Sequence, residues 1–356
     1  MGTLERSIIS ALRAGIPPEE GVERFSVGRR AILERFHQDL ERVENGHSAL
    51  RYISADIGLG KTHLLRLLRS QAFGKDFVVT EVELSTSRCP LFNLLDVYRH
   101  IMLGLRTAQS PREPALEVVL DRWLEFQRRA SPADRARSLG RLPLDLQAAL
   151  LSYLNATNFL RPWPQRRDAV LRWLIGERLP LAQRDPIELY DNIGDVNALA
   201  MLAAISQLFR DIGYGGICIL FDEAESLVSF SRSKQKDRAV LNLTRLVRAA
   251  GTTVGCYFVY ATTPSFVDAY GARPEFRPAG ADGTALQLEA LSPEDVKELI
   301  DLLIKLYCEA FGDVIPDGWA GRIRTALSGR ATARVSDLTR AIISSLDEIR
   351  DGSAPN

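Results

Sequence analysis

The sequence predicts an α/β fold in which a parallel sheet is flanked by helices and followed by an all-helical C-terminal domain. Three observations predict it. A glycine-containing loop, Ser54 to His63, lies between a strand pattern and a helix pattern. A second apolar run, 217–221, ends in the carboxylates Asp222 and Glu223. A well-capped helix start at Ser292 opens a segment whose apolar residues recur at helical spacing.

The composition is that of an ordinary globular protein. The chain has 356 residues, 46% hydrophobic and 25% charged, which leaves room for two or three domains. Its formal net charge is zero, so overall charge indicates neither a nucleic-acid nor a membrane partner. No apolar run approaches the roughly 20 residues that span a bilayer. The four cysteines lack C-x-x-C spacing and predict buried free thiols rather than a zinc site. We expect a cytoplasmic protein.

The N-terminal 45 residues predict two helices joined by a turn. Apolar residues recur at helical spacing over 4–14, and Gly15 to Pro18 ends that helix. Val27-Gly28-Arg29 precedes a second amphipathic helix that carries apolar residues from 32 to 43. A turn of this kind just before a phosphate loop can wrap an adenine base with its backbone groups. An ordinary capped helix after a glycine turn is the alternative.

The segment Ala55-Asp56-Ile57-Gly58-Leu59-Gly60-Lys61-Thr62-His63 predicts a phosphate-binding loop. It follows the pattern G-x-x-x-x-G-K-[ST], with Ala55 in place of the first glycine, between a strand at 49–54 and a helix. The glycines allow backbone N–H groups to surround an anion, and the following helix directs its positive end at the phosphates. Lys61 can reach the β- and γ-phosphates, and the Thr62 hydroxyl can bind Mg²⁺. We therefore expect residues 56–63 to contact a nucleotide.

A large helical insertion is expected after the next strand, 77–84. Residues 90–190 show helical spacing interrupted by prolines, with helices expected at 91–105, 116–126, 144–154 and 170–175. Between 112 and 178 the chain has 12 arginines and 8 acidic residues. The densest arginine run is Arg122, Arg128, Arg129, Arg135, Arg137 and Arg141. A solvated helix face and a surface for nucleic acid or an acidic partner are both compatible with this run.

The apolar strand 217–223 predicts the second nucleotide motif. It follows a helix at 197–209 and presents its carboxylates where ligands of parallel sheets bind. Asp222 would hold Mg²⁺ through water, and Glu223 would act as the general base on the attacking water. A strand that runs into an acidic first helical turn is the alternative. The phosphate loop upstream favours the nucleotide interpretation.

A helix at 239–249 and a buried strand at 254–264 follow, and the strand ends in hydroxyl residues. Thr262 or Thr263 could contact the γ-phosphate or the attacking water, although a polar strand end before a proline turn has the same pattern. Residues 265–284 predict a loop, in which Arg273 or Arg277 could reach the nucleotide of a neighbouring subunit or lie on the surface. A last strand is expected at 284–288.

The C-terminal segment predicts a helical lid. Ser292-Pro293-Glu294-Asp295 combines a cap, a proline at the first helical position and acidic residues in the first turn. Further helices are expected at 316–328 and 334–349. Arg334, at the start of the last one, could close on the γ-phosphate, with Arg330 and Arg340 as competing candidates. The expected domains are an N-terminal segment 1–45, a core 46–290 and a lid 291–356.

With these motifs in this order, the chain resembles the AAA+ P-loop ATPases. Val27-Gly28-Arg29 and Leu291-Ser292-Pro293-Glu294 resemble the origin-recognition/Cdc6-like branch. More closely, the chain resembles the bacterial ATP-binding proteins of BREX phage-defence systems. The residues that carry this second resemblance are Ala14 to Pro17, Phe25 to Arg29, Asp56 to Thr62 and Leu220 to Glu225. The resemblance implies the fold of a P-loop NTPase, with an AAA+-like sheet and a helical lid. It also implies ATP and Mg²⁺ as cofactors.

The resemblance also implies action in multi-protein defence against phage DNA, in which we expect an ATPase that works as a nucleotide-driven switch or motor. Its partners would be helicase, nuclease or methyltransferase proteins, with direct DNA contact and a homo-oligomer as further possibilities. A scaffold that binds ATP with little turnover and recruits a helicase or nuclease is one alternative. A transposition or replication helper ATPase is another, although the chain ends soon after the lid helices and leaves no room for a winged-helix domain. The sequence has no N-K-x-D motif, which favours ATP over GTP.

Overall fold

The computed structural model describes residues 2–157, 163–230, 232–271, 273–276, 285–312, 318–327 and 334–351. The strands of this part of the chain are β1 (Ala49–Ser54), β2 (Val78–Glu83), β3 (Ile217–Asp222), β4 (Cys256–Thr262) and β5 (Leu286–Gln287). Its helices are α1 (Thr3–Arg13), α2 (Arg30–Glu44), α3 (Lys61–Phe73), α4 (Leu94–Leu103), α5 (Leu116–Arg129), α6 (Pro132–Gly140), α7 (Leu144–Ala156), α8 (Pro164–Leu174), α9 (Leu181–Arg184), α10 (Ala198–Asp211), α11 (Ser233–Thr252), α12 (Pro264–Phe266), α13 (Pro293–Phe311), α14 (Trp319–Leu327) and α15 (Val335–Arg350).

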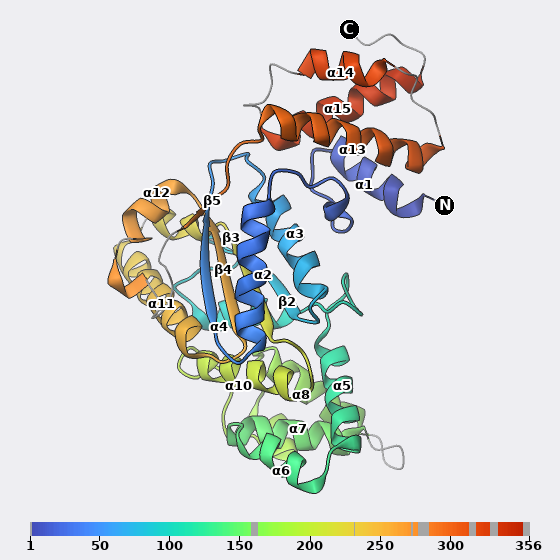
Figure 1. The fold of residues 1–356 in the computed structure, drawn as a ribbon. Coiled ribbons are helices and arrows are strands. Elements are labelled where there is room, and N and C mark those ends of the chain that lie inside the picture. Colours follow the sequence, from blue (N-terminus) through green and yellow to red (C-terminus); the bar gives the residue numbers. More distant parts are fainter. Residues whose placement is uncertain are drawn as a thin grey trace. The chain divides into compact units, whose positions relative to one another are not determined.

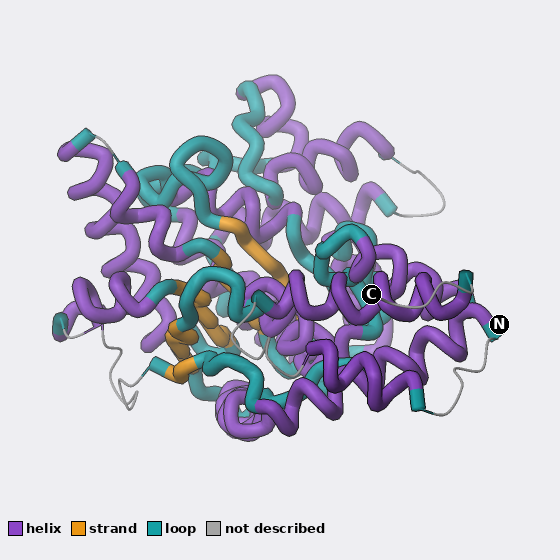
Figure 2. Tube along the Cα trace, turned by 90° about the horizontal axis from the view of Figure 1, so that it is seen from above, coloured by secondary structure: helices purple, strands orange, loops and turns teal. Residues whose placement is uncertain are grey.

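The strands form one five-stranded sheet in the order β2-β3-β4-β1-β5. The pairs β2–β3, β3–β4 and β1–β5 are parallel, with Val82 opposite Phe221 and Ile53 opposite Leu286. Every residue of β4 is buried, and so are the first five of β3, as expected for parallel strands covered on both faces. Helices surround the strands in Figure 2. The predicted α/β fold with a parallel sheet flanked by helices is confirmed.

The chain forms two compact units. The sheet unit comprises Gln38–Tyr52 and Ala72–Ala285, and the loop-and-lid unit comprises Met1–His37, Ile53–Gln71 and Leu286–Asn356. The division therefore falls inside α2, β1 and α3, which each contribute to both units. The three domains expected from the sequence stay a prediction.

The sheet unit has one hydrophobic core that includes the helical insertion. The core runs from β2, β3 and β4 through α4 and α10 to α5, α7 and α8, the green helices of Figure 1. Trp123 and Trp173 are 0% and 1% exposed at its centre. The Trp173 indole N–H donates to the Asp191 carbonyl at 2.9 Å, which satisfies its polar atom. The insertion is thus packed as part of the unit.

The loop-and-lid unit joins the first helix of the chain to the last ones. Helix α1 packs against α13 and α15, as Figure 1 shows, and buries Ile8, Ile9 and Leu12. The Arg13 guanidinium donates to both carboxylate oxygens of Asp347, at 2.8 and 2.7 Å. In the described part of the chain, the helices of the segment expected to form a lid therefore pack together with α1 from the N-terminal segment.

Several predicted boundaries shift, mostly because of proline. The helix expected at 170–175 begins at Pro164, and α6 was not predicted; both start with Pro at the first helical position. The loop expected at 265–284 contains short helical turns at Pro264–Phe266, Val267–Gly271 and Pro274–Phe276, and 277–284 lies outside the described residues. The strand expected at 254–264 begins only at Cys256, because Gly255 has φ 77°.

Among the residues described, no helix is long and apolar enough to cross a membrane. Cys89, Cys218 and Cys256 are buried free thiols, as expected, whereas Cys308 is partly exposed.

Candidate functional site

The predicted phosphate loop connects the end of β1 to the start of α3. Gly58 and Gly60 have φ 92° and 94°, a left-handed conformation that side chains disfavour, so both positions call for glycine. Ala55, which replaces the first glycine of the pattern, is accommodated with only 2% of its surface exposed. Lys61 opens α3 and its Nζ donates to the Ala55 carbonyl at 3.2 Å, across the base of the loop. The lysine is thereby held over the loop.

The donor set of this loop fits a polyphosphate with Mg²⁺. The two glycines turn the backbone, the N-terminus of the 13-residue α3 follows directly, and Lys61 adds a positive charge. Thr62 is exposed in the first turn of α3, and a hydroxyl at this place in the pattern is a ligand type that Mg²⁺ accepts. Asp56 and Ile57 are also exposed, Ile57 to 76%. These groups are of the kind that would suit a phosphate.

The start of α15 lies directly on the phosphate loop. The Val335 N–H donates to the Gly58 carbonyl at 3.0 Å. A Cβ added to Gly58 would lie 2.5 Å from Cγ of Arg334, so the arginine stem covers the glycine. Arg340 instead reaches the Ala14 carbonyl, at 3.5 Å. Arg330 lies outside the described residues. Of the candidate lid arginines that can be placed, Arg334 is the one at the loop.

The turn Val27-Gly28-Arg29 touches the loop and the start of the lid. Arg29 is 8% exposed, and its guanidinium donates to the Glu289 carbonyl at 3.0 Å and to the Leu59 carbonyl at 3.3 Å. Burial lowers the pKa of Arg29 while the charge of Asp295 opposes this shift. Gly28 has φ 67°, and a Cβ there would lie 2.8 Å from the Asp295 carboxylate. Sequence reasoning placed this turn beside the nucleotide but gave no sign of the Arg29 bonds, because both acceptors are backbone carbonyls.

His63 fastens α3 to the same turn. Its Nε2 lies 2.7 Å from the Ser26 hydroxyl, which itself donates to the Val22 carbonyl at 2.6 Å. Since the single hydroxyl hydrogen is used, His63 is the donor to Ser26. Burial, aided by the charges of Arg29 and Arg66, lowers the pKa of His63 to about 4, so the ring is neutral at pH 7. The predicted contact between His63 and a nucleotide stays a prediction.

The acidic end of β3 carries the other predicted motif. The Glu223 N–H donates to Oδ1 of Asp222 at 2.9 Å. Glu223 has φ 59° and ψ 36°, a left-handed conformation that costs a non-glycine residue on the order of 1–2 kcal/mol. In the described part of the chain, Asp76 and Glu188 are the only other non-glycine residues with a positive φ. Local strain of this kind concentrates at functional positions.

The end of β4, the strand beside β3, separates the two threonine candidates. Thr262 is 0% exposed, and its hydroxyl has no hydrogen-bond partner among the described residues. The Thr263 hydroxyl is 3.0 Å from that of Ser265. A buried hydroxyl without a partner is costly unless a ligand or water satisfies it, so Thr262 fits the predicted polar role better.

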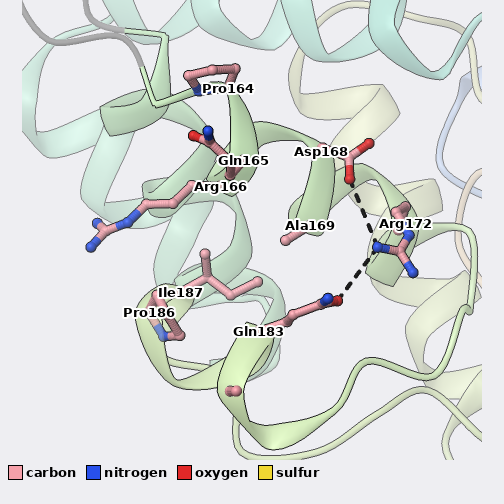
Figure 3. A pocket seen from close by; sticks show the side chains of 10 residues that line it. Pro164, Gln165, Arg166, Asp168, Ala169, Arg172, Gln183, Pro186 and Ile187 are labelled. Atoms are coloured by element: carbon pink, nitrogen blue, oxygen red, sulfur yellow. Dashed lines mark hydrogen bonds and ion pairs between the residues drawn. The ribbon is translucent and has the colours of Figure 1, made fainter.

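The remaining candidates lie elsewhere. Arg273 is exposed with its guanidinium 5.0 Å from the Tyr270 ring centre, and Arg277 lies outside the described residues. A cavity of about 490 Å³ lies between α8 and residues 182–187 in the helical insertion (Figure 3). None of the predicted site residues lines this cavity.

The structure thus groups the predicted residues by unit. Residues 27–29, 56–63 and Arg334 belong to the loop-and-lid unit, and residues 222–223 and 262–263 belong to the sheet unit. Within the sheet unit, the acidic pair and the threonines follow the carboxyl ends of the neighbouring parallel strands β3 and β4.

Comparisons with known proteins identify the family. Among solved structures, the chain is similar to the ORC2 protein of Aeropyrum pernix in ADPNP–ADP complexes, with 14% sequence identity and a TM-score of 0.46. That match covers 92% of this chain but only 64% of the other, so the chain spans less than two thirds of that protein. No curated protein sequence matches the chain. Residues 3–141 and 137–349 match the family described as BREX system ATP-binding protein BrxC/D. These matches extend over nearly the whole chain, which therefore belongs to the family of BREX system ATP-binding proteins BrxC/D.

Proposed function

We propose that the protein hydrolyses ATP and acts as a nucleotide-driven switch in a BREX phage-defence system. The observation that carries this proposal is the phosphate loop. Gly58 and Gly60 turn the backbone in left-handed conformations, and Lys61 is held across the loop by the Ala55 carbonyl. Family membership supports ATP as the nucleotide.

Each predicted residue has a chemical role in this proposal. Lys61 binds the β- and γ-phosphates, while Thr62 and, through water, Asp222 hold Mg²⁺. Mg²⁺, when bound, would neutralise the charge that develops on the phosphates. Glu223 accepts a proton from the attacking water, and Thr262 or Thr263 positions that water. Arg334 senses the γ-phosphate, and Arg273 or Arg277 could serve a neighbouring subunit.

The switch follows from the contact between α15 and the loop. Val335 and Arg334 rest on Gly58, so a change in the loop alters the first turn of α15. ATP can shift this arrangement only if it contacts the two states differently. We infer that the movement changes how the protein meets DNA-processing partners.

Two substitutions test the proposal. Lys61→Ala removes the charged phosphate contact, worth about 1.5–3 kcal/mol, and should weaken ATP binding by at least about tenfold. Glu223→Gln should bind ATP normally but slow turnover by about 10²-fold or more. Fluorescent-nucleotide titration measures binding, and phosphate release measures turnover.

Glu225→Gln is the matched control, because it makes the same change two residues further on and should keep normal turnover. If Glu223→Gln turned over at nearly the wild-type rate, Glu223 would not be the base. If Lys61→Ala bound ATP like the wild type, the loop would not be the phosphate site.

A scaffold with little turnover is the second candidate, and the exposed apolar residues of the insertion favour it. Leu144, Trp163, Leu181 and Tyr190 are 71%, 47%, 61% and 77% exposed. Exposed apolar residues mark a protein-binding site where they form one contiguous patch, which is what this candidate requires of them. Turnover stimulated by duplex DNA would support the switch. ATP-dependent assembly without turnover, measured by light scattering, would support the scaffold.

A further inference from the structure

The buried guanidinium of Arg29 connects two parts of the loop-and-lid unit that are far apart in sequence. One arm reaches Leu59 in the phosphate loop, and the other reaches Glu289, between β5 and α13. We propose that Arg29 is a positioning residue that couples the phosphate loop to the first lid helix. The proposal rests on the ATP-binding function proposed above.

On the loop side, the bond acts through one peptide group. The Leu59 carbonyl and the Gly60 N–H belong to the same planar trans peptide, so they point in opposite directions. Arg29 holds this carbonyl at 3.3 Å and thereby fixes the direction of the Gly60 N–H. That N–H belongs to the second loop glycine, which the loop would present to a phosphate. Through its bond to Leu59, the Arg29 side chain therefore orients a group that would donate to a phosphate.

On the lid side, the Val27-Gly28-Arg29 turn contacts the start of α13. The Glu289 carbonyl accepts from Arg29 at 3.0 Å, three residues before the N-cap Ser292. Asp295 completes the cap by accepting from the Ser292 N–H at 2.9 Å, and its carboxylate faces Gly28. A shift of the Val27-Gly28-Arg29 turn would therefore disturb the first turn of α13.

The chemistry requires arginine. A guanidinium offers donors in a fixed fork and can hold two acceptors at once, whereas a lysine ammonium is a single point on a flexible stem. Since Arg29 is only 8% exposed, water competes little for its bonds. A change that reorients the Leu59–Gly60 peptide therefore alters the hydrogen bond of Arg29 to Glu289. By linkage, a change at Glu289 alters the orientation of that peptide.

The test compares Arg29→Lys and Arg29→Gln with Arg30→Gln. Arg30 is the matched control, because its side chain is 93% exposed and pairs only with Glu34 on the surface, at 2.8 Å, among the contacts described. Full-length protein is titrated with Mg-ATP and with Mg-ADP, and amide hydrogen exchange of residues 293–297 is followed with and without ATP. In the wild type and in Arg30→Gln, we expect ATP to slow exchange there.

In the Arg29 variants we expect ATP affinity to fall about 5- to 20-fold, within the usual range of coupling between sites. We also expect ATP no longer to change exchange in residues 293–297. A purely structural role would raise exchange in the absence of nucleotide but leave the ATP-induced change intact, and that result would overturn the proposal. If neither Arg29 variant folds, Gly28→Ala decides, because a Cβ in this left-handed position strains the turn that carries Arg29 and meets the Asp295 carboxylate at 2.8 Å; it should abolish the same ATP-induced change.

The two proposals fail in different ways. If the wild type does not bind ATP, the proposed function is wrong. If the wild type binds ATP and the Arg29 variants behave like Arg30→Gln, only the coupling role of Arg29 is wrong.

Discussion

At the scale of single residues, backbone strain marks the acidic motif. Glu223 follows a strand whose first five residues are fully buried, and it adopts a left-handed conformation although it is not glycine. Glu223 could leave the left-handed conformation only if the turn after β3 changed. The packing of the buried strand therefore keeps Glu223 in this strained conformation. The sequence showed which side chain follows Asp222, but the conformation of Glu223 depends on the elements on either side of it.

Glu223→Gly should separate stability from activity. Glycine adopts a left-handed conformation without the steric cost, so the free energy of unfolding should rise by about 0.5–1 kcal/mol while turnover falls. Glu188→Gly is the control, since Glu188 has φ 58° and no predicted catalytic role; it should gain similar stability and keep its turnover. Urea unfolding and phosphate release measure the two effects. Loss of stability in both variants would contradict the strain argument.

At the scale of elements, a buried polar network joins α2, β1 and β4. Arg51 on β1 is 5% exposed and forms a two-pronged ion pair with Asp39 on α2, with N–O distances of 2.9 and 3.0 Å. The Tyr257 hydroxyl on β4 donates to the same carboxylate at 2.9 Å. These three residues fix α2 against one face of the central strands. Nothing in the sequence pairs positions 39, 51 and 257, because the pairing depends on strand order.

Asp39→Ala should destabilise the protein strongly. It leaves the Arg51 guanidinium without its buried counter-charge, and breaking a buried pair in this way costs about 3–5 kcal/mol. The double variant Asp39→Leu, Arg51→Met replaces the pair with apolar groups and should recover much of that loss. Urea unfolding of the single and double variants measures both effects. If the double variant were the less stable of the two, the desolvation argument would fail.

At the scale of the whole molecule, the chain ends in the unit in which it begins. Helix α1 contributes Ile8, Ile9 and Leu12 to the same core as α13 and α15. The phosphate loop lies in this unit too, through 53–71. The glycine loop and the C-terminal helices therefore belong to one compact unit built from three separate stretches of sequence.

Ile9→Ala should destabilise the packing of α1 against α13 and α15. Ile9 is 0% exposed, and truncating a buried isoleucine costs about 2–5 kcal/mol. The loss should appear as faster hydrogen exchange in α13 and α15, although these helices begin 284 and 326 residues after Ile9 in the sequence. Leu4→Ala on the same helix, where Leu4 is 36% exposed, should have a much smaller effect. Exchange that rises only within α1 would show that the helix packs independently.

The local motifs could be predicted from the sequence because each is read from neighbouring residues. Glycine spacing predicted the turn that precedes α3, apolar runs predicted β3 and β4, and the Ser292 cap predicted the start of α13. Side-chain periodicity and backbone conformation need no tertiary information. The same reasoning located Arg334 at the start of the last helix.

What the tertiary structure decided is which of these elements meet, because contacts between distant residues depend on strand order and helix packing. Only the fold brings Arg29 to the carbonyls of Leu59 and Glu289, since backbone acceptors carry no side-chain signature. Only the fold seats Arg334, rather than Arg340, on Gly58. The sequence by itself determined the glycine loop, the acidic end of β3 and the capped start of α13. The tertiary structure decided that the glycine loop meets both Arg29 and the start of α15, because these contacts join residues far apart in the chain.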